Sequence, residues 1–289
     1  MTQKHALAIH DISCVGRCSL TVALPVLSSV GIETSVLPTA VLSTQTGGFE
    51  GYTFLDLTDE MTPIEQHWKR LGLKFDAVYT GFLGSVEQTG IAGEILDDFR
   101  RKGEILLVDP VIADSGKLYP VFPQEMVQGM RALCRKATLI VPNRTEAALL
   151  LEESYSEGIC TETAVRNTLR RLADLAGGSA VLTGVSLAPG RLGAASYDAT
   201  RDAFSYSDGS FVDRIFHGTG DAFASALLAA LMNTSSLERA VEIAVWFTHR
   251  CIERTVEAGR PAKFGPCFEP VLPELIHVLG LEPTEPIEI

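Results

Sequence analysis

Short apolar runs alternate with longer stretches of helical periodicity along this chain. The runs are rich in Val, Ile and Leu, and they predict strands at residues 7–10, 32–38, 77–80, 105–109, 138–141 and 180–183. Residues 19–30, 62–71 and 86–102 follow helical spacing, and the chain from residue 219 onward is predicted to be helical as well. Strands that are apolar on both faces are typical of a parallel sheet covered by helices. The alternation therefore predicts a doubly wound α/β fold, with a mostly parallel central sheet and helices on both faces.

Residues 191–216 interrupt this alternation. Three short runs, at residues 193–197, 203–206 and 211–216, predict a small antiparallel patch there. In the first predicted helix, Ser19 is placed to cap the start, Gly31 to close the end and Pro25 to introduce a kink. The sequence contains no linker, repeat or low-complexity segment, so we predict one domain over residues 1–289.

Composition and charge narrow the classes of function. Of the 289 residues, 46% are apolar and 21% are charged, which is ordinary for a globular protein with a substantial core. The formal net charge is −12, from 36 acidic and 24 basic residues. This balance argues against DNA or RNA as a partner, because nucleic-acid binders neutralise phosphates with Lys and Arg. A small anionic ligand remains compatible, since backbone N–H groups can hold phosphate without net positive charge.

The sequence favours a cytoplasmic protein without a membrane span. The N-terminal apolar run is too short for a signal peptide, and no stretch approaches the ~20 apolar residues that a span needs. The longest apolar stretch, residues 222–232, has the length of a buried helix. The six cysteines form neither a C-x-x-C pair nor a zinc-finger pattern, so we expect reduced thiols.

Polar residues follow the predicted strands at the positions where ligands are expected. In parallel α/β sheets, ligands bind beyond the carboxyl ends of the strands. Asp11, Gly81, Asp109, Asn143 and Thr183 stand in the loops after the predicted strands. These positions therefore mark the edge of the sheet where a site is expected.

The most informative stretch is Gly218-Thr219-Gly220-Asp221, at the start of an apolar helix. The glycines allow close backbone approach, and free N–H groups at a helix N-terminus attract anions. Asp221 is either a carboxylate that favours the helix dipole or a catalytic base, and the motif alone leaves both open. The stretch is not a dinucleotide fingerprint, since Phe223 stands where the third glycine is required. Residues 115–118 approach a P-loop but lack its leading glycine and its final Ser or Thr.

Oxygen ligands at two further strand ends indicate a magnesium site. Asn143 and Glu146 open a helix, and Asp109 precedes a rigid proline turn. Carboxylates, water and substrate phosphates are the ligands that Mg²⁺ prefers. Both features also have a structural interpretation, because Asn and Glu three residues apart form a capping box and Asp-Pro commonly starts a turn.

Together these motifs resemble the ribokinase-like superfamily, and in particular its pyridoxal/pyridoxamine kinase branch. D-P-V at residues 109–111, P-N-x-x-E at 142–146 and G-T-G-D at 218–221 occur in the order typical of that branch. Residues 80–88, with G-F-L-G-S followed by V-E-Q, closely resemble a segment of these vitamin kinases. Residues 17–21 resemble the start of their first helix, and residues 43–46 resemble their substrate-side flap. The similarity extends over roughly residues 5–256.

The resemblance implies an ATP-dependent phosphotransferase that acts on the hydroxymethyl group of a B6 vitamer. Asp221 would take the proton from the acceptor hydroxyl group. Gly218, Thr219 and Gly220 would stabilise charge on the transferring phosphoryl group, which is the larger part of catalysis in this chemistry.

The resemblance also implies the ligand contacts and the assembly. The residues implied for ATP are Asp109, Asn143, Glu146, Thr183 and Thr219, with Asp109 and Glu146 holding Mg²⁺ through water. The residues implied for the acceptor are Asp11, Thr46, Phe82 and Asp221. Such kinases are usually homodimers, and a monovalent cation is a further cofactor to test.

Asp11 departs from the family pattern, because many pyridoxal kinases carry a Ser at this position that hydrogen-bonds the pyridine ring. A carboxylate could pair with a protonated ring nitrogen or an amine more strongly than a hydroxyl group could. It could equally cap a loop by accepting from nearby backbone N–H groups. The sequence leaves both interpretations open.

The acceptor also stays open. Aminopyrimidine kinases of thiamine synthesis share most of this layout, so a hydroxymethylpyrimidine kinase, alone or with dual specificity, is the second interpretation. A sugar or nucleoside kinase is third, since the glycine-rich N-terminal motif and longer lid of those enzymes are not evident here. The non-enzymatic alternative is a catalytically silent vitamin-binding relative, against which the intact Gly220 and Asp221 argue.

Overall fold

Strands and helices alternate along the chain, as the sequence pattern predicts. The computed structural model describes residues 3–234 and 236–281. The strands are β1 (Lys4–Ser13), β2 (Ile32–Leu42), β3 (Phe54–Asp56), β4 (Ala77–Thr80), β5 (Ile105–Val108), β6 (Ala113–Asp114), β7 (Lys117–Leu118), β8 (Leu139–Ile140), β9 (Ser179–Val185), β10 (Arg191–Asp198) and β11 (Ala203–Ser210). The α-helices are α1 (Leu20–Ser29), α2 (Thr58–Leu71), α3 (Val86–Asp98), α4 (Glu125–Cys134), α5 (Arg144–Leu151), α6 (Glu162–Ala176), α7 (Thr219–Asn233), α8 (Leu237–Glu257) and α9 (Leu272–Val278).

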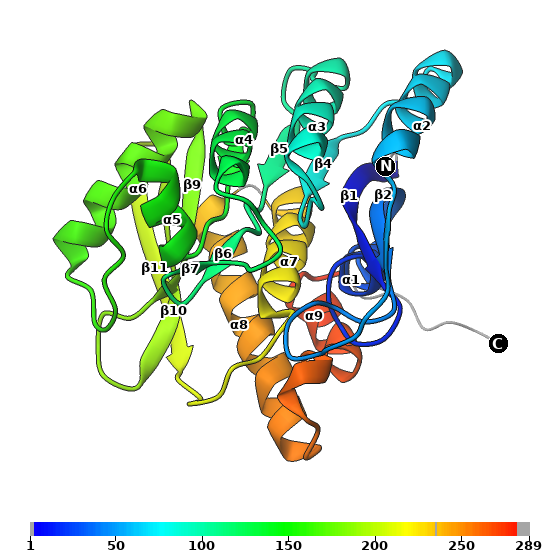
Figure 1. The fold of residues 1–289 in the computed structure, drawn as a ribbon. Coiled ribbons are helices and arrows are strands. Elements are labelled where there is room, and N and C mark those ends of the chain that lie inside the picture. Colours follow the sequence, from blue (N-terminus) through cyan, green and yellow to red (C-terminus); the bar gives the residue numbers. More distant parts are fainter. Residues whose placement is uncertain (1–2, 235, 282–289) are drawn as a thin grey trace.

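One mixed sheet runs through the molecule (Figure 1). Within the described residues it has nine strands in the order β11-β10-β9-β8-β5-β4-β1-β2-β3. The central strands from β9 to β2 pair in parallel. The edges are antiparallel, with β3 against β2 on one side and β10 and β11 beyond β9 on the other. The predicted doubly wound α/β fold is confirmed.

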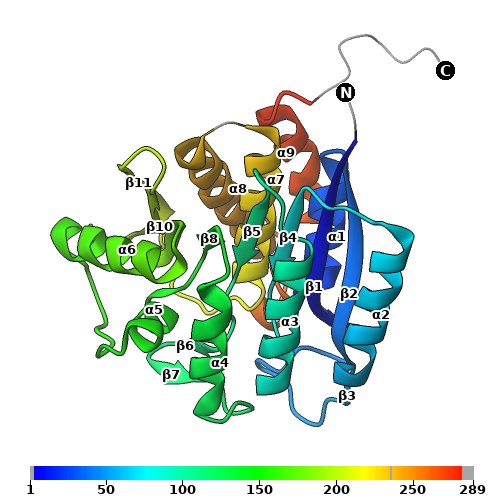
Figure 2. The same cartoon turned by 90° about the horizontal axis from the view of Figure 1, so that it is seen from above.

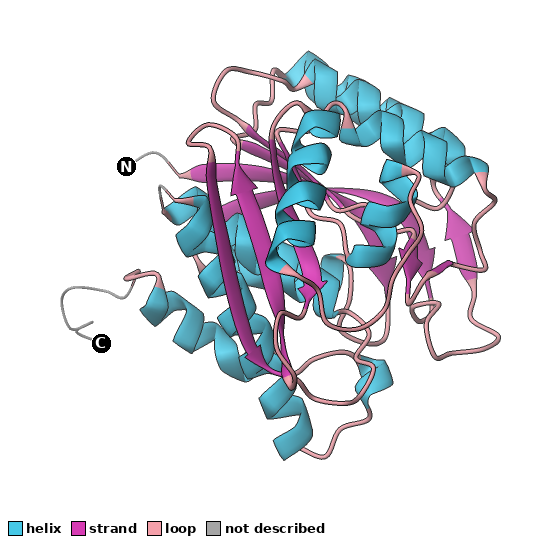
Figure 3. Cartoon of the chain, turned by 90° about the vertical axis from the view of Figure 1, so that its left-hand side faces the viewer, coloured by secondary structure: helices cyan, strands magenta, loops and turns pink. Residues whose placement is uncertain are grey.

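Helices cover both faces of this sheet (Figures 2 and 3). One hydrophobic core lies between the sheet and α1, α7, α8 and α9, and the other lies between the sheet and helices α2 to α6. In β4, Val78 enters one core and Tyr79 enters the other. Burial on both faces explains why the strands appear in the sequence as continuous apolar runs. Among the described helices, none is both long enough and apolar enough to cross a bilayer.

Three predictions about helix ends need correction. The helix predicted over residues 86–102 ends at Asp98, because Phe99 turns into the core and is only 5% exposed. The helix predicted over residues 62–71 begins earlier, at Thr58, whose amide donates to Asp56 Oδ1 at 2.7 Å. Ser19 precedes α1 as predicted, but its side chain makes no capping hydrogen bond to that helix. Pro25 does lie inside α1.

The antiparallel patch predicted near residues 191–216 is an extension of the main sheet. Its first two runs are β10 and β11, which pair with β9 and with each other. The third run, residues 211–216, forms no strand, which corrects that part of the prediction. Phe211 and Ile215 are 49% and 72% exposed, so their apolar side chains do not face a core.

A small second sheet, formed by β6 and β7, was not predicted. These two strands are joined by Ser115 and Gly116, which have φ of 51° and 77°. Positive φ at both central residues is the geometry of a tight type I′ hairpin turn. The residues that partly resemble a P-loop in the sequence therefore form a hairpin turn instead.

Candidate active site

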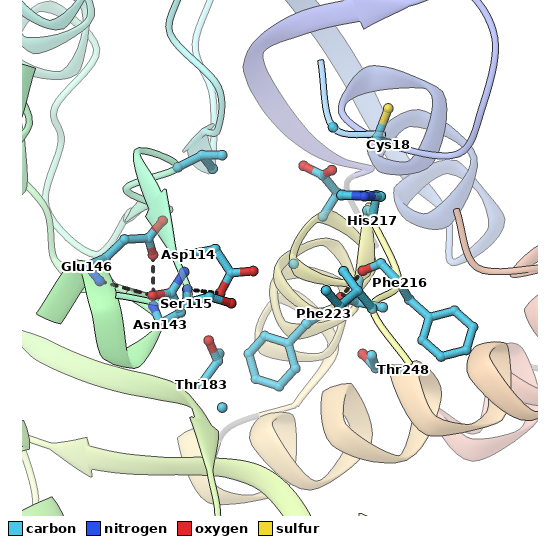
Figure 4. Close-up of a pocket in the computed structure, with 18 of the residues that line it drawn as sticks. Cys18, Asp114, Ser115, Asn143, Glu146, Thr183, Phe216, His217, Phe223 and Thr248 are labelled. Carbon is cyan, nitrogen blue, oxygen red and sulfur yellow. Dashed lines mark hydrogen bonds between the residues drawn. The ribbon is translucent and has the colours of Figure 1, made fainter. Parts of the chain in front are cut away.

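The carboxyl ends of the parallel strands open into one cavity of about 1170 Å³ (Figure 4). Backbone hydrogen bonds hold these ends together, from Asp109 N to Thr80 O at 3.0 Å and from Thr183 N to Pro142 O at 3.0 Å. All residues that the sequence analysis assigned to a site line this cavity: Asp11, Thr46, Phe82, Asp109, Asn143, Glu146, Thr183, Gly218, Thr219, Gly220 and Asp221. The fold brings them together, while their individual roles remain predictions.

A constrained turn places residues 218–220 at the start of α7. Gly218 precedes the helix with φ 77°, a region that favours glycine. A β-carbon at Gly218 would lie 2.1 Å from the carbonyl oxygen of Arg17, so there is also no room for a side chain. Gly220 differs, because a β-carbon there would have no heavy atom within 4 Å. The first amides of α7 have no acceptor within the helix and border the cavity, which makes them donors for an anion.

Asp221 lies in the first turn of α7 and borders the cavity. Burial raises the pKa of its carboxyl group from 3.8 to about 7. The backbone N–H of Ser19 opposes this rise, and the negative charge of Asp11 adds to it. A carboxylate with a pKa near neutral is suited to take a proton from a hydroxyl group at physiological pH.

Asn143 and Glu146 form the capping box that the sequence allowed. Asn143 Oδ1 accepts from the amides of Thr145 at 2.8 Å and Glu146 at 3.0 Å, and Glu146 Oε2 accepts from the amide of Asn143 at 2.8 Å. Glu146 Oε1 also accepts from the amide of Ile112 at 3.1 Å. Burial raises the pKa of Glu146 to about 8, although these backbone hydrogen bonds oppose the rise. Through these hydrogen bonds, Glu146 links the segment after β5 to the start of α5.

Asp109 and Glu146 place two buried carboxyl groups near each other at this edge of the sheet. Burial raises the pKa of Asp109 well above its ordinary value, and the carboxylates of Glu146 and Asp221 raise it further. A cation would relieve this repulsion, so the donor set fits Mg²⁺ in charge and in ligand type. Within residues 3–234 and 236–281, no three His, Cys, Asp or Glu side chains are grouped as a metal site. A bound Mg²⁺ would therefore need water or substrate oxygens to complete its ligands.

Asp11 lies in β1, beside a shift in the register between β1 and β2. It is only 3% exposed, and Ser13 Oγ donates a hydrogen bond of 2.9 Å to its Oδ2. Burial raises the pKa of Asp11, while the hydroxyl groups of Ser19 and Ser13 lower it. Asp11 thus has local partners and also lines the cavity, so both interpretations from the sequence remain compatible with the structure.

Thr46 belongs to the loop of residues 43–53 that joins β2 to β3 and borders the cavity. The loop is anchored to the segment before α9, because Gln45 Nε2 donates to Lys263 O at 2.7 Å. Phe49 packs edge-to-face on Phe264, with 5.3 Å between ring centroids. Phe82, which follows β4, lines the same cavity.

Many residues that line this cavity had no functional role assigned from the sequence, and Ser19, Asp114 and His217 are among them. The ring of His217 lies against the loop after β2, where a β-carbon at Gly47 would be 2.6 Å from its Nδ1. Burial lowers the pKa of His217, and the charge of Asp114 opposes this. The available signal for His217 was its place directly before Gly218. Asp114 and Ser19 gave none, because neither follows a predicted strand.

Comparison with known proteins identifies the family. A sequence profile described as phosphomethylpyrimidine kinase matches residues 25–267. The chain belongs to the phosphomethylpyrimidine kinase family. It is thus a phosphotransferase that acts on an alcohol group, and the ribokinase-like kinase expected from the sequence is confirmed. Of the carboxylates in the cavity of this kinase, Asp109, Glu146 and Asp221 lie within the matched region, and Asp11 precedes it.

Solved structures extend the similarity over the whole kinase. A protein of Bacteroides thetaiotaomicron described as a phosphomethylpyrimidine kinase is 37% identical with a TM-score of 0.91, covering 100% of this chain and 96% of that one. A crystal form of a protein of the same description, obtained with pyridoxal, gives 36% identity and a TM-score of 0.89 over 98% of each chain. Pyridoxal kinase from Lactobacillus plantarum is 29% identical, with a TM-score of 0.87 over 96% of this chain and 98% of that one. Among curated sequences, the pyridoxine/pyridoxal/pyridoxamine kinase of Bordetella avium is 25% identical over 283 residues, which is 92% of this chain and 90% of that protein.

Proposed function

We propose that this kinase uses ATP to phosphorylate the hydroxymethyl group of a B6 vitamer, giving the 5′-phosphate. The observation that carries this proposal is the 36% identical structure crystallised with pyridoxal, which matches 98% of this chain. The similarity to the Lactobacillus plantarum pyridoxal kinase and to the Bordetella avium kinase supports the same acceptor class.

Asp221 would act as the general base in this reaction. Its carboxylate stands at the start of α7, next to the amides that border the cavity. An acceptor hydroxyl group bound near Asp221 would lie beside the N–H groups of Gly218, Thr219 and Gly220, and its oxygen would become the nucleophile when Asp221 takes its proton. Those donors would stabilise the negative charge on the transferring phosphoryl group. Positioning and charge stabilisation are the main contributions that a protein makes to this chemistry.

The ATP side of the cavity would be formed by strand ends. Asn143 and Thr183 are neighbours there, joined by an isolated parallel bridge, and Thr219 opens the facing helix. Asp109 and Glu146 would hold Mg²⁺ through water, and the ion would neutralise phosphate charge. Glu146 is suited to a water-mediated contact, because both of its oxygens already accept backbone hydrogen bonds.

The acceptor side would be formed by Asp11, Thr46 and Phe82. Phe82 would provide an aromatic face for the ring, while Thr46 and Asp11 would provide polar contacts. Residues 42–52 would act as a flap, since Gly47 and Gly48 give this segment backbone freedom and Phe49 and Tyr52 would exclude water once it closes.

A hydroxymethylpyrimidine kinase of thiamine synthesis is the second candidate function. The family profile favours it, because its description names phosphomethylpyrimidine. The two acceptors share an aromatic nitrogen ring with a hydroxymethyl group, so one cavity could accept both. A catalytically silent vitamin-binding relative is the remaining alternative, and the retained Asp221 argues against it.

Measurement of ATP consumption against a panel of acceptors tests the proposal. The panel contains pyridoxal, pyridoxine, pyridoxamine, hydroxymethylpyrimidine and simple sugars, with the phosphorylated product identified by mass spectrometry. We expect the highest kcat/KM for a B6 vitamer, and the same assay in EDTA tests the magnesium requirement. A higher kcat/KM for the aminopyrimidine would establish the second candidate instead, and binding without turnover would establish the silent relative.

The homodimer implied by the family resemblance is part of the same proposal. Sedimentation equilibrium of the purified chain would give about twice the monomer mass of 31.2 kDa. A single species at the monomer mass would contradict it.

A further inference from the structure

The ring of His217 lies directly against the flap of residues 42–52. A β-carbon at Gly47 would be 2.6 Å from Nδ1 and 2.7 Å from Cε1 of this ring, and a β-carbon at Gly48 would be 3.3 Å from its Nε2. Gly48 has φ of 77°, so its backbone alone favours glycine. Gly47 has no positive φ, and the group that leaves no room for a side chain there is the His217 ring. The ring therefore contacts the flap along two consecutive glycines.

His217 also belongs to residues 216–220, the phosphate turn at the start of α7. Within this turn, Thr219 Oγ1 donates to Phe216 O at 3.1 Å. Gly218 fixes the turn from outside, because its β-carbon position lies 2.1 Å from a carbonyl oxygen of the turn after β1. The His217 ring borders the cavity beside these residues (Figure 4). A single side chain thus touches both the flap and the turn proposed to hold phosphate.

The flap is held on another side by the segment before α9. Gln45 Nε2 donates to Lys263 O at 2.7 Å. Phe49 packs edge-to-face on Phe264, and Lys263 Nζ lies 4.9 Å from the centroid of the Phe49 ring, within the range of a cation–π contact. Phe264 O in turn accepts from Arg17 N at 2.9 Å, in the turn after β1. The segment that anchors the flap is therefore tied to the same turn that packs on the phosphate turn.

These contacts form a closed circuit around the acceptor side of the cavity. Arg17 contributes its carbonyl oxygen to the circuit twice, because the β-carbon positions of Gly218 and Gly265 lie 2.1 Å and 2.3 Å from it. The His217 ring completes the circuit from the side of the phosphate turn. Its contact with the flap is one residue from Thr46, which lines the cavity. The position of Thr46 should therefore depend on this ring.

We propose that His217 is a positioning residue: its ring supports the closed flap at Gly47 and Gly48 and so links Thr46 to the phosphate turn. This inference rests on the proposed function, in which residues 42–52 close over the acceptor and Thr46 contacts it. The ring acts by packing against backbone, so its flat shape matters and its ability to titrate does not.

His217→Ala removes this support. We expect the KM for the acceptor to rise about three- to tenfold, while the Kd for ATP, measured by calorimetry, stays within about twofold. Hydrogen exchange of residues 42–52, measured with a non-hydrolysable ATP analogue and pyridoxal bound, should be at least about threefold faster than in the wild type. His217→Phe keeps a flat ring and should restore both quantities to within about twofold of the wild type.

Gly47→Ala tests the same contact from the side of the flap. Its backbone tolerates a side chain, but the methyl group must push the His217 ring aside. We expect an acceptor KM raised about three- to tenfold, as in His217→Ala. Because the methyl group acts through the ring, the double variant should differ from His217→Ala by less than about twofold in acceptor KM. If His217→Ala does not fold, Gly47→Ala and His217→Phe still give the exchange and the KM.

His249→Ala is the matched control. His249 is another partly buried histidine that lines the cavity, but its ring packs on Gly209, and its Nε2 lies 3.0 Å from Leu192 O. It is placed on α8 and not in the phosphate turn. Exchange of residues 42–52 should therefore be the same in His249→Ala as in the wild type.

Three results would overturn the inference. The first is wild-type exchange of residues 42–52 in a ligand-bound His217→Ala or Gly47→Ala protein. The second is an acceptor KM that neither substitution changes. The third is a double variant in which the two effects on the acceptor KM multiply, which would make them independent. Failure of the proposed function is distinguishable, because it would show as wild-type protein that phosphorylates no B6 vitamer. The exchange comparison can then be made with whichever acceptor of the panel is phosphorylated.

Discussion

The carbonyl oxygen of Arg17 packs against Gly218, at a distance of only 2.1 Å from where a β-carbon of Gly218 would lie. This contact joins the turn after β1, which precedes Ser19, to the turn that begins α7 and carries Asp221. Two segments that lie far apart in the sequence thus form one wall of the cavity. Its integrity depends on a glycine whose φ of 77° also disfavours a side chain.

Gly218→Ala should therefore disrupt the wall. The added methyl group meets backbone rather than a flexible side chain, so the turn must shift. We expect a loss of roughly 1–3 kcal/mol in the free energy of unfolding and a kcat below about 10% of the wild type. Chemical denaturation and steady-state kinetics measure both quantities.

Gly220→Ala is the matched control for that substitution. Its methyl group enters open space and its backbone is not at positive φ, so the free energy of unfolding should stay within about 0.5 kcal/mol. The methyl group would nevertheless stand beside the amides proposed to hold the phosphoryl group, and kcat should fall roughly tenfold. Unchanged kcat in Gly220→Ala would argue against a phosphate cradle at this turn.

Asp221→Asn should stabilise the ligand-free protein at alkaline pH. Burial raises the pKa of Asp221 to about 7 in the folded protein, so the folded state holds this proton more tightly than the unfolded chain. The stability linked to this proton is complete below pH ~4 and is lost as the pH rises through about 7. Asn does not titrate, so the variant does not lose stability in this way as the pH rises. The free energy of unfolding of the variant, relative to the wild type, should thus increase by roughly 2–3 kcal/mol between pH 5 and pH 8.

Denaturation in EDTA, at a series of pH values, measures this difference without metal or nucleotide. Asp174→Asn, at an exposed position on α6, is the control for removal of a carboxylate. A relative stability of Asp221→Asn that does not change with pH would mean that Asp221 is well solvated, contrary to the structure.

The sequence pattern predicted the strands well but not every element boundary. Strands buried on both faces leave continuous apolar runs, and the parallel strands were recognised from them. β6 and β7 have only two residues each, and their short length leaves no periodic pattern to detect. The end of α3 was missed because the turn of Phe99 into the core depends on tertiary contacts that helix spacing does not encode.

The candidate site could be located from the sequence because it lies at strand ends. Once a parallel sheet is predicted, the residues that follow its strands must meet at one edge, and Asp109, Asn143 and Thr183 do so. Ser19 could not be recognised in the same way. Its φ of 53° is a property of the folded backbone, and no residue pattern reports it.

Glu146→Gln should separate the structural role of Glu146 from a magnesium role. If Glu146 organises Mg²⁺, the concentration of Mg²⁺ at half-maximal rate should rise several-fold, while the KM for the acceptor changes little. Some loss of stability, about 1–3 kcal/mol, is expected in addition, because an amide group cannot accept all of the backbone hydrogen bonds that Glu146 now accepts.

Asp114→Asn is the control, because Asp114 lines the same cavity and has no proposed metal role. If both variants raise the Mg²⁺ concentration at half-maximal rate equally, the effect comes from the total charge of the cavity and not from Glu146 in particular. No shift in Glu146→Gln would leave Glu146 as a helix cap.

Asp11→Ser should change the choice among acceptors. A buried carboxylate that faces a ring nitrogen or an amine favours the protonated ligand, and such a charge-assisted hydrogen bond contributes roughly 1.5–3 kcal/mol. The kcat/KM values for pyridoxal, pyridoxine, pyridoxamine and hydroxymethylpyrimidine should therefore shift relative to one another by about ten- to a hundredfold. Ser13→Ala, which removes a local partner of Asp11, is a milder comparison. If the kcat/KM values for all four acceptors change by the same factor while the ATP affinity stays constant, Asp11 has only a structural role.

The most direct test of the account is the turnover of Asp221→Asn with saturating ATP, Mg²⁺ and the best B6 vitamer of the panel. Calorimetry on the same preparation reports whether ATP and the vitamer still bind. We predict binding within a few-fold of the wild type and a kcat lower by ~10²-fold or more, because the site keeps its shape and loses its proton acceptor. Turnover close to that of the wild type would contradict the assignment of Asp221 as the base.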